Sequence, residues 1–215
     1  MRALLIALVL LCALPASAED ILVDAVLVVV ETAPIAASQV AFERDLRKRI
    51  SGPQCAESFG RLLCSGSEPL EALIFREILR QEGVARDIEV SASEGPSRLK
   101  AFVRSFGGRD GSEQFMARWH ITEQDLTEFF GEIAVLDQAI EVTVGRLVRD
   151  IPEEEERRYH AENMDSIFGG RPYEDVAVIV SRQYYGFKFE RTFDAWASEL
   201  RSGARIRYIG RPGAR

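Results

Sequence analysis

The stretch FMARWHITEQDLTEFF, residues 115–130, joins two helical patterns at a well-marked boundary. Its first part belongs to a short predicted helix that begins at Ser112, and its second part opens a long one that begins at Thr122. Thr122 and Asp125 resemble a capping box, in which each side chain satisfies a free backbone N–H at the helix start. Apolar residues then recur at helical spacing as far as Leu147, so the stretch predicts a long helix with a buried face.

The same stretch concentrates large apolar side chains on both sides of that boundary. They are Phe115, Met116 and Trp119 in the short helix and Phe129 and Phe130 in the long one. Aromatic residues at helical spacing are usually buried, which favours a place in the core. Met and aromatic side chains also suit a surface that accepts many sequences. These five residues are therefore either core residues or a candidate peptide-binding site.

Other segments of the chain have the apolar spacing and the start or stop signals of helices. We predict these helices over 38–50, 69–83, 97–108, 152–163 and 172–202. Two segments near the chain ends differ, because 26–30 is a run of Val and Leu and 205–209 alternates like an edge strand. An unpaired strand leaves its amides unsatisfied, so we expect the two segments to pair. The predicted fold class is mainly α, with N- and C-terminal strands paired in a small sheet.

The first twenty residues have the order of a secretory signal. A basic residue precedes an apolar run over 3–14, and the small residues ASA follow before the acidic pair ED. We expect cleavage after Ala18, which leaves 19–215 as a single exported domain. The residue before Cys12 is not small, which disfavours lipid attachment there. The apolar run is shorter than the ~20 residues of a membrane helix, so a protein that does not span the membrane is expected.

The charge balance excludes one class of partner. The chain has 27 Lys and Arg residues against 34 Asp and Glu residues, which gives a formal net charge of −7. A net acidic chain without a basic stripe is a poor candidate for binding phosphate backbones. No nucleic-acid partner is expected.

Few residues are suited to acid–base chemistry. The two histidines, His120 and His160, stand in no metal-ligand, triad or phosphate-loop motif, so structural or solvated roles are favoured for both. The acidic run 153–156 is favoured as a solvated helix start, where the helix dipole suits negative charge. We predict no catalytic residues, no cofactor and no metal site. A hydrolase built on either histidine is a distant alternative.

Cys55 and Cys64 form an even pair once the signal is removed, and an oxidising compartment favours a bridge between them. A continuous helix would separate their Cα atoms by ~13 Å, which exceeds the ~7 Å that a disulfide spans. A bridge therefore requires a turn, for which Gly60 is the natural place. The alternative is two separate free thiols.

Five blocks of sequence, in order, resemble the SurA-like periplasmic chaperones. The blocks are VDAVLVVVETAPIAASQV (23–40), LEALIFREILRQEG (70–83), FGGRDGSEQFMARWHITEQDLTEFF (106–130), IPEEEERRYHAEN (151–163) and FDAWASELRSGARIRYI (193–209). The resemblance covers roughly Val23 to Ile209 and implies a helical domain like the N-terminal domain of that family. It also implies that helix 172–202 packs back on the N-terminal part. Residues 51–67, which hold both cysteines, look like an insertion.

One departure from the family pattern bears on activity. A parvulin isomerase domain would stand between the EEEERRYHAEN helix and the last helix, but only MDSIFGGR separates Asn163 from Pro172. A domain of about a hundred residues cannot fit there. Prolyl isomerase activity is therefore not expected.

The resemblance implies an ATP-independent periplasmic holdase for unfolded or nascent exported polypeptides, including outer-membrane proteins. In that hypothesis part of the apolar surface at residues 115–130 lines a cradle for the polypeptide. The alternative is a non-enzymatic adaptor or subunit that has kept the fold and binds one specific folded partner.

Overall fold

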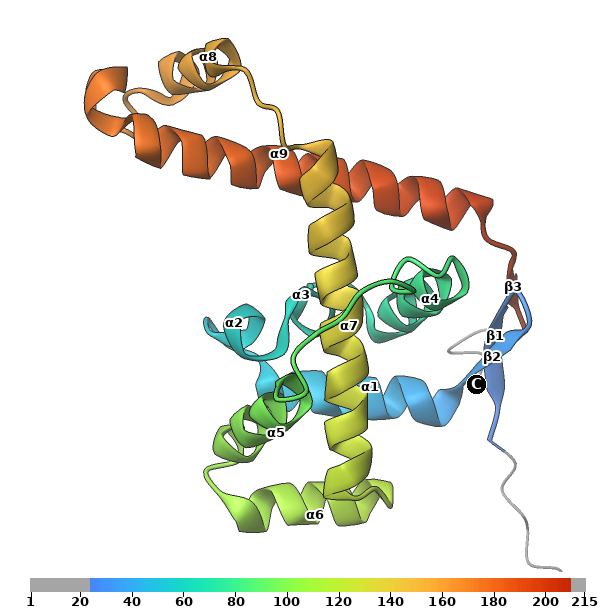
Figure 1. Cartoon of the computed structure of the whole chain (residues 1–215). Coiled ribbons are helices and arrows are strands. Elements are labelled where there is room, and N and C mark those ends of the chain that lie inside the picture. Colours follow the sequence, from blue (N-terminus) through green and yellow to red (C-terminus); the bar gives the residue numbers. More distant parts are fainter. Residues whose placement is uncertain (1–23, 210–215) are drawn as a thin grey trace, which may run out of the picture.

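The structure is a computed structural model that describes residues 24–209, and within them the chain forms nine helices and three strands (Figure 1). The protein is thus mainly helical with a small antiparallel sheet, as predicted. The strands are β1 (Val26–Val30), β2 (Ala33–Ala36) and β3 (Ile206–Tyr208). The helices are α1 (Ala37–Ile50), α2 (Cys55–Phe59), α3 (Arg61–Cys64), α4 (Pro69–Gln81), α5 (Glu94–Ser105), α6 (Arg109–Trp119), α7 (Glu123–Leu147), α8 (Glu153–Asn163) and α9 (Tyr173–Gly203). The expected signal over 1–18, with its cleavage point after Ala18, lies outside the described residues.

The sheet brings the two ends of the described chain together in the strand order β2-β1-β3, with both pairings antiparallel. Val28 lies opposite Tyr208 and Val30 opposite Ile206, which confirms the predicted pairing of 26–30 with 205–209. β2 was not predicted as a separate strand. The chain turns back after β1 through Glu31, a non-glycine residue with a φ of 51°, and no glycine marks this turn in the sequence.

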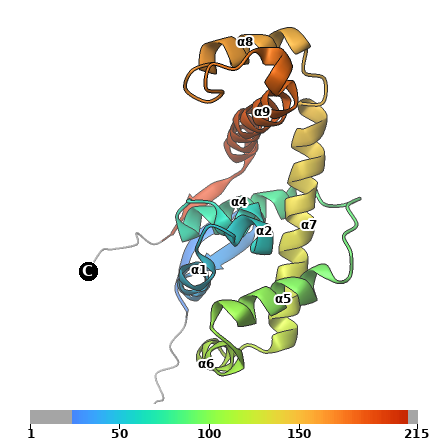
Figure 2. The ribbon, with the colours of Figure 1, turned by 90° about the vertical axis from the view of Figure 1, so that its left-hand side faces the viewer.

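The main core extends along α7, with helices α1 to α6 around it (Figures 1 and 2), and Phe189 of α9 also belongs to it. Leu126, Phe130 and Ile133 project from α7 into this core and are at most 1% exposed. The predicted capping box is confirmed, because the Thr122 hydroxyl accepts from the Asp125 N–H (3.1 Å) and the Asp125 carboxylate accepts from the Thr122 N–H (2.8 Å). The start of α7 is thus fixed by local side chains and its face by burial.

Two predicted helix starts were late by about one turn. α6 begins at Arg109 and not at Ser112, because the two glycines that end the preceding segment, Gly107 and Gly108, both adopt positive φ values (73° and 139°) just before it. Ser112 is buried inside the helix, where its hydroxyl donates to the Arg109 carbonyl (2.8 Å). α5 begins at Glu94, so Pro96 occupies its first turn, a position that proline tolerates.

The last helix, α9, crosses the molecule and contacts the N-terminal part through its C-terminal half (Figure 1). Its N-terminal half carries α8 to one side of the main core (Figures 1 and 2). We call residues 153–187 the arm. Phe168, Val176 and Val180 form a small separate core inside it, and each is at most 2% exposed.

Residues 164–172 connect α8 directly to α9 within the arm. None of the helices between residues 24 and 209 combines the length and the hydropathy that a bilayer span requires.

Candidate functional site

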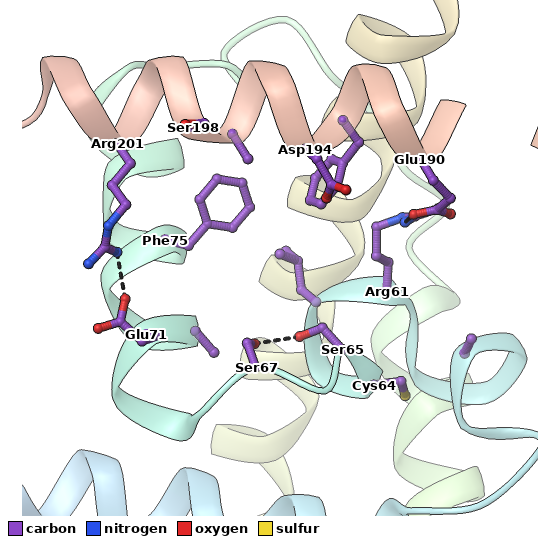
Figure 3. A pocket seen from close by; sticks show the side chains of 15 residues that line it. Arg61, Cys64, Ser65, Ser67, Glu71, Phe75, Glu190, Asp194, Ser198 and Arg201 are labelled. Atoms are coloured by element: carbon purple, nitrogen blue, oxygen red, sulfur yellow. Dashed lines mark hydrogen bonds and ion pairs between the residues drawn. The ribbon is translucent and has the colours of Figure 1, made fainter. Parts of the chain in front are cut away.

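A cavity of about 720 Å³ opens between α3, α4 and the C-terminal half of α9 (Figure 3). We call it the groove. The C-terminal half of α9 forms one wall along the whole groove, and the α3–α4 segment forms the opposite wall (Figure 3). This volume lies within the range of about 300–1,000 Å³ that is typical of ligand-binding pockets.

The floor of the groove is apolar. Phe75 from α4 lies between the walls (Figure 3), and its ring centroid is 5.8 Å from that of Phe193 on α9 in a T-shaped arrangement. Leu62, Ala72 and Ala197 extend the apolar lining. We call Phe75 and Phe193 the groove pair. Both are half-buried, so each ring keeps part of its surface available to a ligand.

Two ion pairs close the rim and tie α9 to the N-terminal part. At one end Arg61 of α3 forms a bidentate pair with Glu190 of α9, with N–O distances of 2.7 and 2.8 Å. At the other end Arg201 of α9 lies 2.6 Å from Glu71 of α4. Figure 3 shows the two pairs at opposite ends of the groove. The C-terminal half of α9 therefore contacts α3 and α4 through specific polar pairs around an apolar floor.

The electrostatics of the Arg61 end follow from its neighbours. The hydrogen bonds to Glu190 raise the pKa of Arg61 above its ordinary value, so this side chain stays charged. Its guanidinium also lies 5.1 Å from the ring centroid of Phe193 and 4.9 Å from that of Phe189, which adds cation–π attraction. Arg61 thus fixes the position of α9 and of one member of the groove pair.

The wall that carries Arg61 is held by a disulfide and a buried carboxylate. Cys55 and Cys64 are bridged with a Cα–Cα distance of 5.7 Å, and the chain turns between them at Gly60, whose φ is 85°. A Cβ atom at Gly60 would lie 1.8 Å from the Asp137 carboxylate, so only glycine fits. That carboxylate accepts from the Leu62 N–H (3.0 Å) at the start of α3.

Asp137 also pairs with Arg98 at 3.0 Å, and the arrangement joins α3 to α5 and α7. Burial raises the pKa of Asp137, whereas the Leu62 N–H and Arg98 act in the opposite direction. The α3 wall of the groove is therefore anchored inside the body of the protein.

The five residues of the candidate peptide-binding site lie elsewhere. Phe115, Met116 and Phe130 are buried, and Trp119 and Phe129 are half-buried. Among the described residues that line the groove, none is one of these five. Whether any of them contacts a polypeptide stays a prediction, and a polypeptide could reach the three buried side chains only after the core opened.

These side chains pack together with aromatic residues of α1 and α5. The whole group, which we call the body cluster, comprises Phe42, Phe102, Phe106, Phe115, Trp119, Phe129 and Phe130. The Trp119 ring N–H donates to the Asp45 carboxylate (3.1 Å), and the guanidinium of Arg76 lies 5.5 Å from the Phe129 ring centroid. Even its half-buried members therefore have partners inside the protein.

The sequence interpretation did not single out the groove. Phe193 lies in the predicted helix 172–202, but the surface that it meets was not predicted. Phe75 precedes Ile78 and Leu79 by three and four residues and shares their side of α4. Because it fits the apolar spacing of the helix, no signal in the sequence distinguishes it from a core residue.

The arm carries a second exposed apolar surface. Val178 is 75% exposed and Ile179 43% exposed on α9, and Phe187 is 43% exposed. Met164 and Ile167, between α8 and α9, are exposed as well. Val178 and Ile179 are neighbours in the chain, and exposed apolar residues that adjoin one another often mark an interaction surface.

Other features favour structural roles. His120 is exposed at the end of α6, whereas His160 is buried in the arm with its Nε2 atom 2.9 Å from the Arg171 carbonyl oxygen. Within the acidic run, Glu153 pairs with Arg157 and Glu155 with Lys188. No group of three or more potential metal ligands occurs between residues 24 and 209.

No protein-family model matches the chain, and no curated protein is detectably similar to it. The SurA-like resemblance therefore rests on the five sequence blocks alone.

Proposed function

We propose that this protein is an ATP-independent chaperone of the SurA-like type, a holdase that binds unfolded exported or outer-membrane polypeptides in the groove between the α3–α4 segment and α9. The observation that carries the proposal is the form of the groove, with an apolar floor around Phe75 and Phe193 and a polar rim. Apolar contact supplies affinity without sequence specificity, and a polar rim leaves the opening hydrated.

The proposed location is the periplasm. The secretory pattern at the start of the sequence supports export, and a disulfide between Cys55 and Cys64 suits an oxidising compartment. We also propose that the protein has no prolyl isomerase activity. The connection over 164–172 supports this, because it leads from one helix of the arm directly to the next.

The experiment is light scattering of an unfolding outer-membrane protein, with and without the purified chain. We expect suppression of aggregation without ATP, and we expect it to survive added salt, because apolar contacts are not screened. A Phe75→Ser/Phe193→Ser variant should lose most of the suppression. The matched control, Val178→Ser/Ile179→Ser on the arm, should keep it.

One observation favours the second candidate, an adaptor that binds one folded partner. The exposed Val178 and Ile179 lie on an arm that has a small core of its own, which presents a fixed apolar surface. Absence of aggregation suppression at several-fold molar excess, together with tight binding of a single folded protein that the arm variant loses, would replace the holdase by this adaptor.

A further inference from the structure

The outer edge of β3 carries backbone groups that no residue between 24 and 209 engages. β3 is an outer strand in the order β2-β1-β3. The Glu31 N–H donates to the Arg205 carbonyl (2.8 Å) and the Ile209 N–H donates to the Leu27 carbonyl (2.9 Å), so these positions bond towards β1. Because bonding alternates along an antiparallel strand, the N–H and C=O groups of Ile206 and Tyr208 point away from β1. Within residues 24–209 no hydrogen bond engages these four groups.

The opposite edge of the sheet is protected. β2 carries Pro34, which lies opposite Val29 and has no N–H to offer. β2 also runs directly into α1, which leaves no extended backbone beyond it. Proline is one of the devices that block pairing at sheet edges, and the described β3 edge lacks it.

The free edge lies next to the groove. The Tyr208 hydroxyl is 3.2 Å from the Arg201 guanidinium and 3.4 Å from the Glu71 carboxylate, and both of these residues line the groove. Tyr208 is 53% exposed, so the edge is open to solvent at the point where it meets the groove.

We propose that the β3 edge binds an extended segment of the unfolded polypeptide as an added strand, while neighbouring residues of the same segment occupy the groove. This inference rests on the proposed function and specifies that the bound polypeptide is extended. The free N–H and C=O groups of Ile206 and Tyr208 match an extended backbone, which is the mode of β-strand addition. Two residues offer few hydrogen bonds, so the adjoining groove supplies the remaining affinity.

The neighbouring side chains specify the segment further. Ile206 packs with the apolar layer between the sheet and α4, whereas Arg207, the next residue, lies towards the other face and is exposed. Cross-strand neighbours of opposite charge stabilise a pair. The preferred segment therefore alternates apolar residues with polar or acidic ones. It contains no proline where a backbone N–H must pair with β3.

The test uses a synthetic peptide that alternates valine with threonine and aspartate. Hydrogen exchange at the Ile206 and Tyr208 amides of the full chain should slow by about tenfold or more when the peptide binds, because both amides become hydrogen-bonded. Tyr208→Pro removes an N–H that faces away from β1, and Tyr208→Ala, its matched control, keeps that N–H. The proline variant should bind the peptide about three- to tenfold more weakly than the alanine variant, as expected for one lost hydrogen bond.

The possible outcomes distinguish a failure of strand addition from a failure of the proposed holdase function. Peptide binding with unchanged exchange at both amides and equal affinity of the two variants overturns strand addition and leaves the groove as the binding site. Failure of the wild-type protein to bind the peptide and to suppress aggregation overturns both proposals. If Tyr208→Pro fails to fold, the exchange measurement on the wild-type protein decides.

Discussion

The body cluster and the groove pair are both groups of aromatic residues brought together by helices, but they differ in what covers them. Phe130 and Phe102 in the body cluster are fully buried, with further aromatic rings within about 6 Å of each. Phe75 and Phe193 contact each other across an open cavity and stay half-buried. The first group can stabilise the fold, and the second has surface left for a ligand.

The difference shows that a cluster of large apolar residues at a helix boundary is a poor guide to a binding surface. Phe115 and Phe130 stand in a stretch that concentrates large apolar residues at a helix boundary, and both end in the core. The groove pair comes from two helices far apart in the chain, and each helix contributes one ring. Site residues of this kind become visible only when the packing of distant elements is known.

The largest expected effect is the loss of a body-cluster ring. Phe130→Ala should lower the free energy of unfolding by about 3–5 kcal/mol, because it removes a fully buried side chain and leaves a cavity. Urea unfolding measures this loss. Phe187→Ala, on the exposed side of the arm, is the matched control and should cost less than half as much. A similar small cost for both variants would mean that the body cluster is not the core of the fold.

Next in size is the disulfide that fixes one wall of the groove. Cys55→Ser/Cys64→Ser should lower the free energy of unfolding by about 2–4 kcal/mol, since the bridge restricts the unfolded chain. We also expect weaker polypeptide binding, because Arg61 and Cys64 belong to that wall. Unfolding of the wild-type protein with and without a reductant gives an independent measurement. An equal stability of the oxidised and reduced forms would contradict this expectation.

Substitution of the groove pair should affect polypeptide binding more than it affects stability. In Phe75→Ala/Phe193→Ala we expect affinity for an unfolded polypeptide to fall by tenfold or more, as for central aromatic contacts in other interfaces. The free energy of unfolding should fall by less per ring than in Phe130→Ala, because both rings are half-buried. Fluorescence anisotropy of a labelled unfolded client measures the affinity. Full affinity in this variant would remove the groove pair from the site.

The smallest effect concerns the start of α7 beside the body cluster. Thr122→Ala should lower the free energy of unfolding by about 1 kcal/mol through loss of the helix cap. The Thr122 backbone N–H, followed by its side chain, lowers the pKa of Asp125 below the ordinary value of 3.8.

That shift has a definite sign. A lowered pKa stabilises the fold at pH values above 3.8, and the contribution is lost as the pH falls below 3.8 towards the pKa of the folded protein. The stability difference between the wild-type protein and Asp125→Asn should therefore shrink over this acidic interval. Thermal unfolding at a series of pH values measures it, and a difference that grows towards acid would contradict the assignment.

The fold was largely predictable because its signals are local. The cap at Thr122 and the β-rich segments at both ends of the described chain identified α7 and the pairing of β1 with β3. β2 was missed because the turn at Glu31 uses a residue that rarely adopts positive φ.

The groove was not predictable for a different reason. Its rim depends on Arg61 meeting Glu190, residues 129 positions apart, and neither residue type indicates its partner in the sequence. The exposure of Val178 on a helix with a regular apolar stripe likewise depends on how far the arm lies from the core. Such features depend on tertiary packing and produce no periodic pattern in the sequence.

The most direct test of the central claim is site-specific photo-cross-linking to an unfolded outer-membrane protein. A p-benzoylphenylalanine is placed at Ser198, which is exposed and lines the groove, or at Val178, which is exposed on the arm. Binding in the groove predicts a cross-link from position 198 that an excess of unlabelled unfolded protein removes, and little from position 178. A cross-link from position 178 with none from position 198 would contradict it.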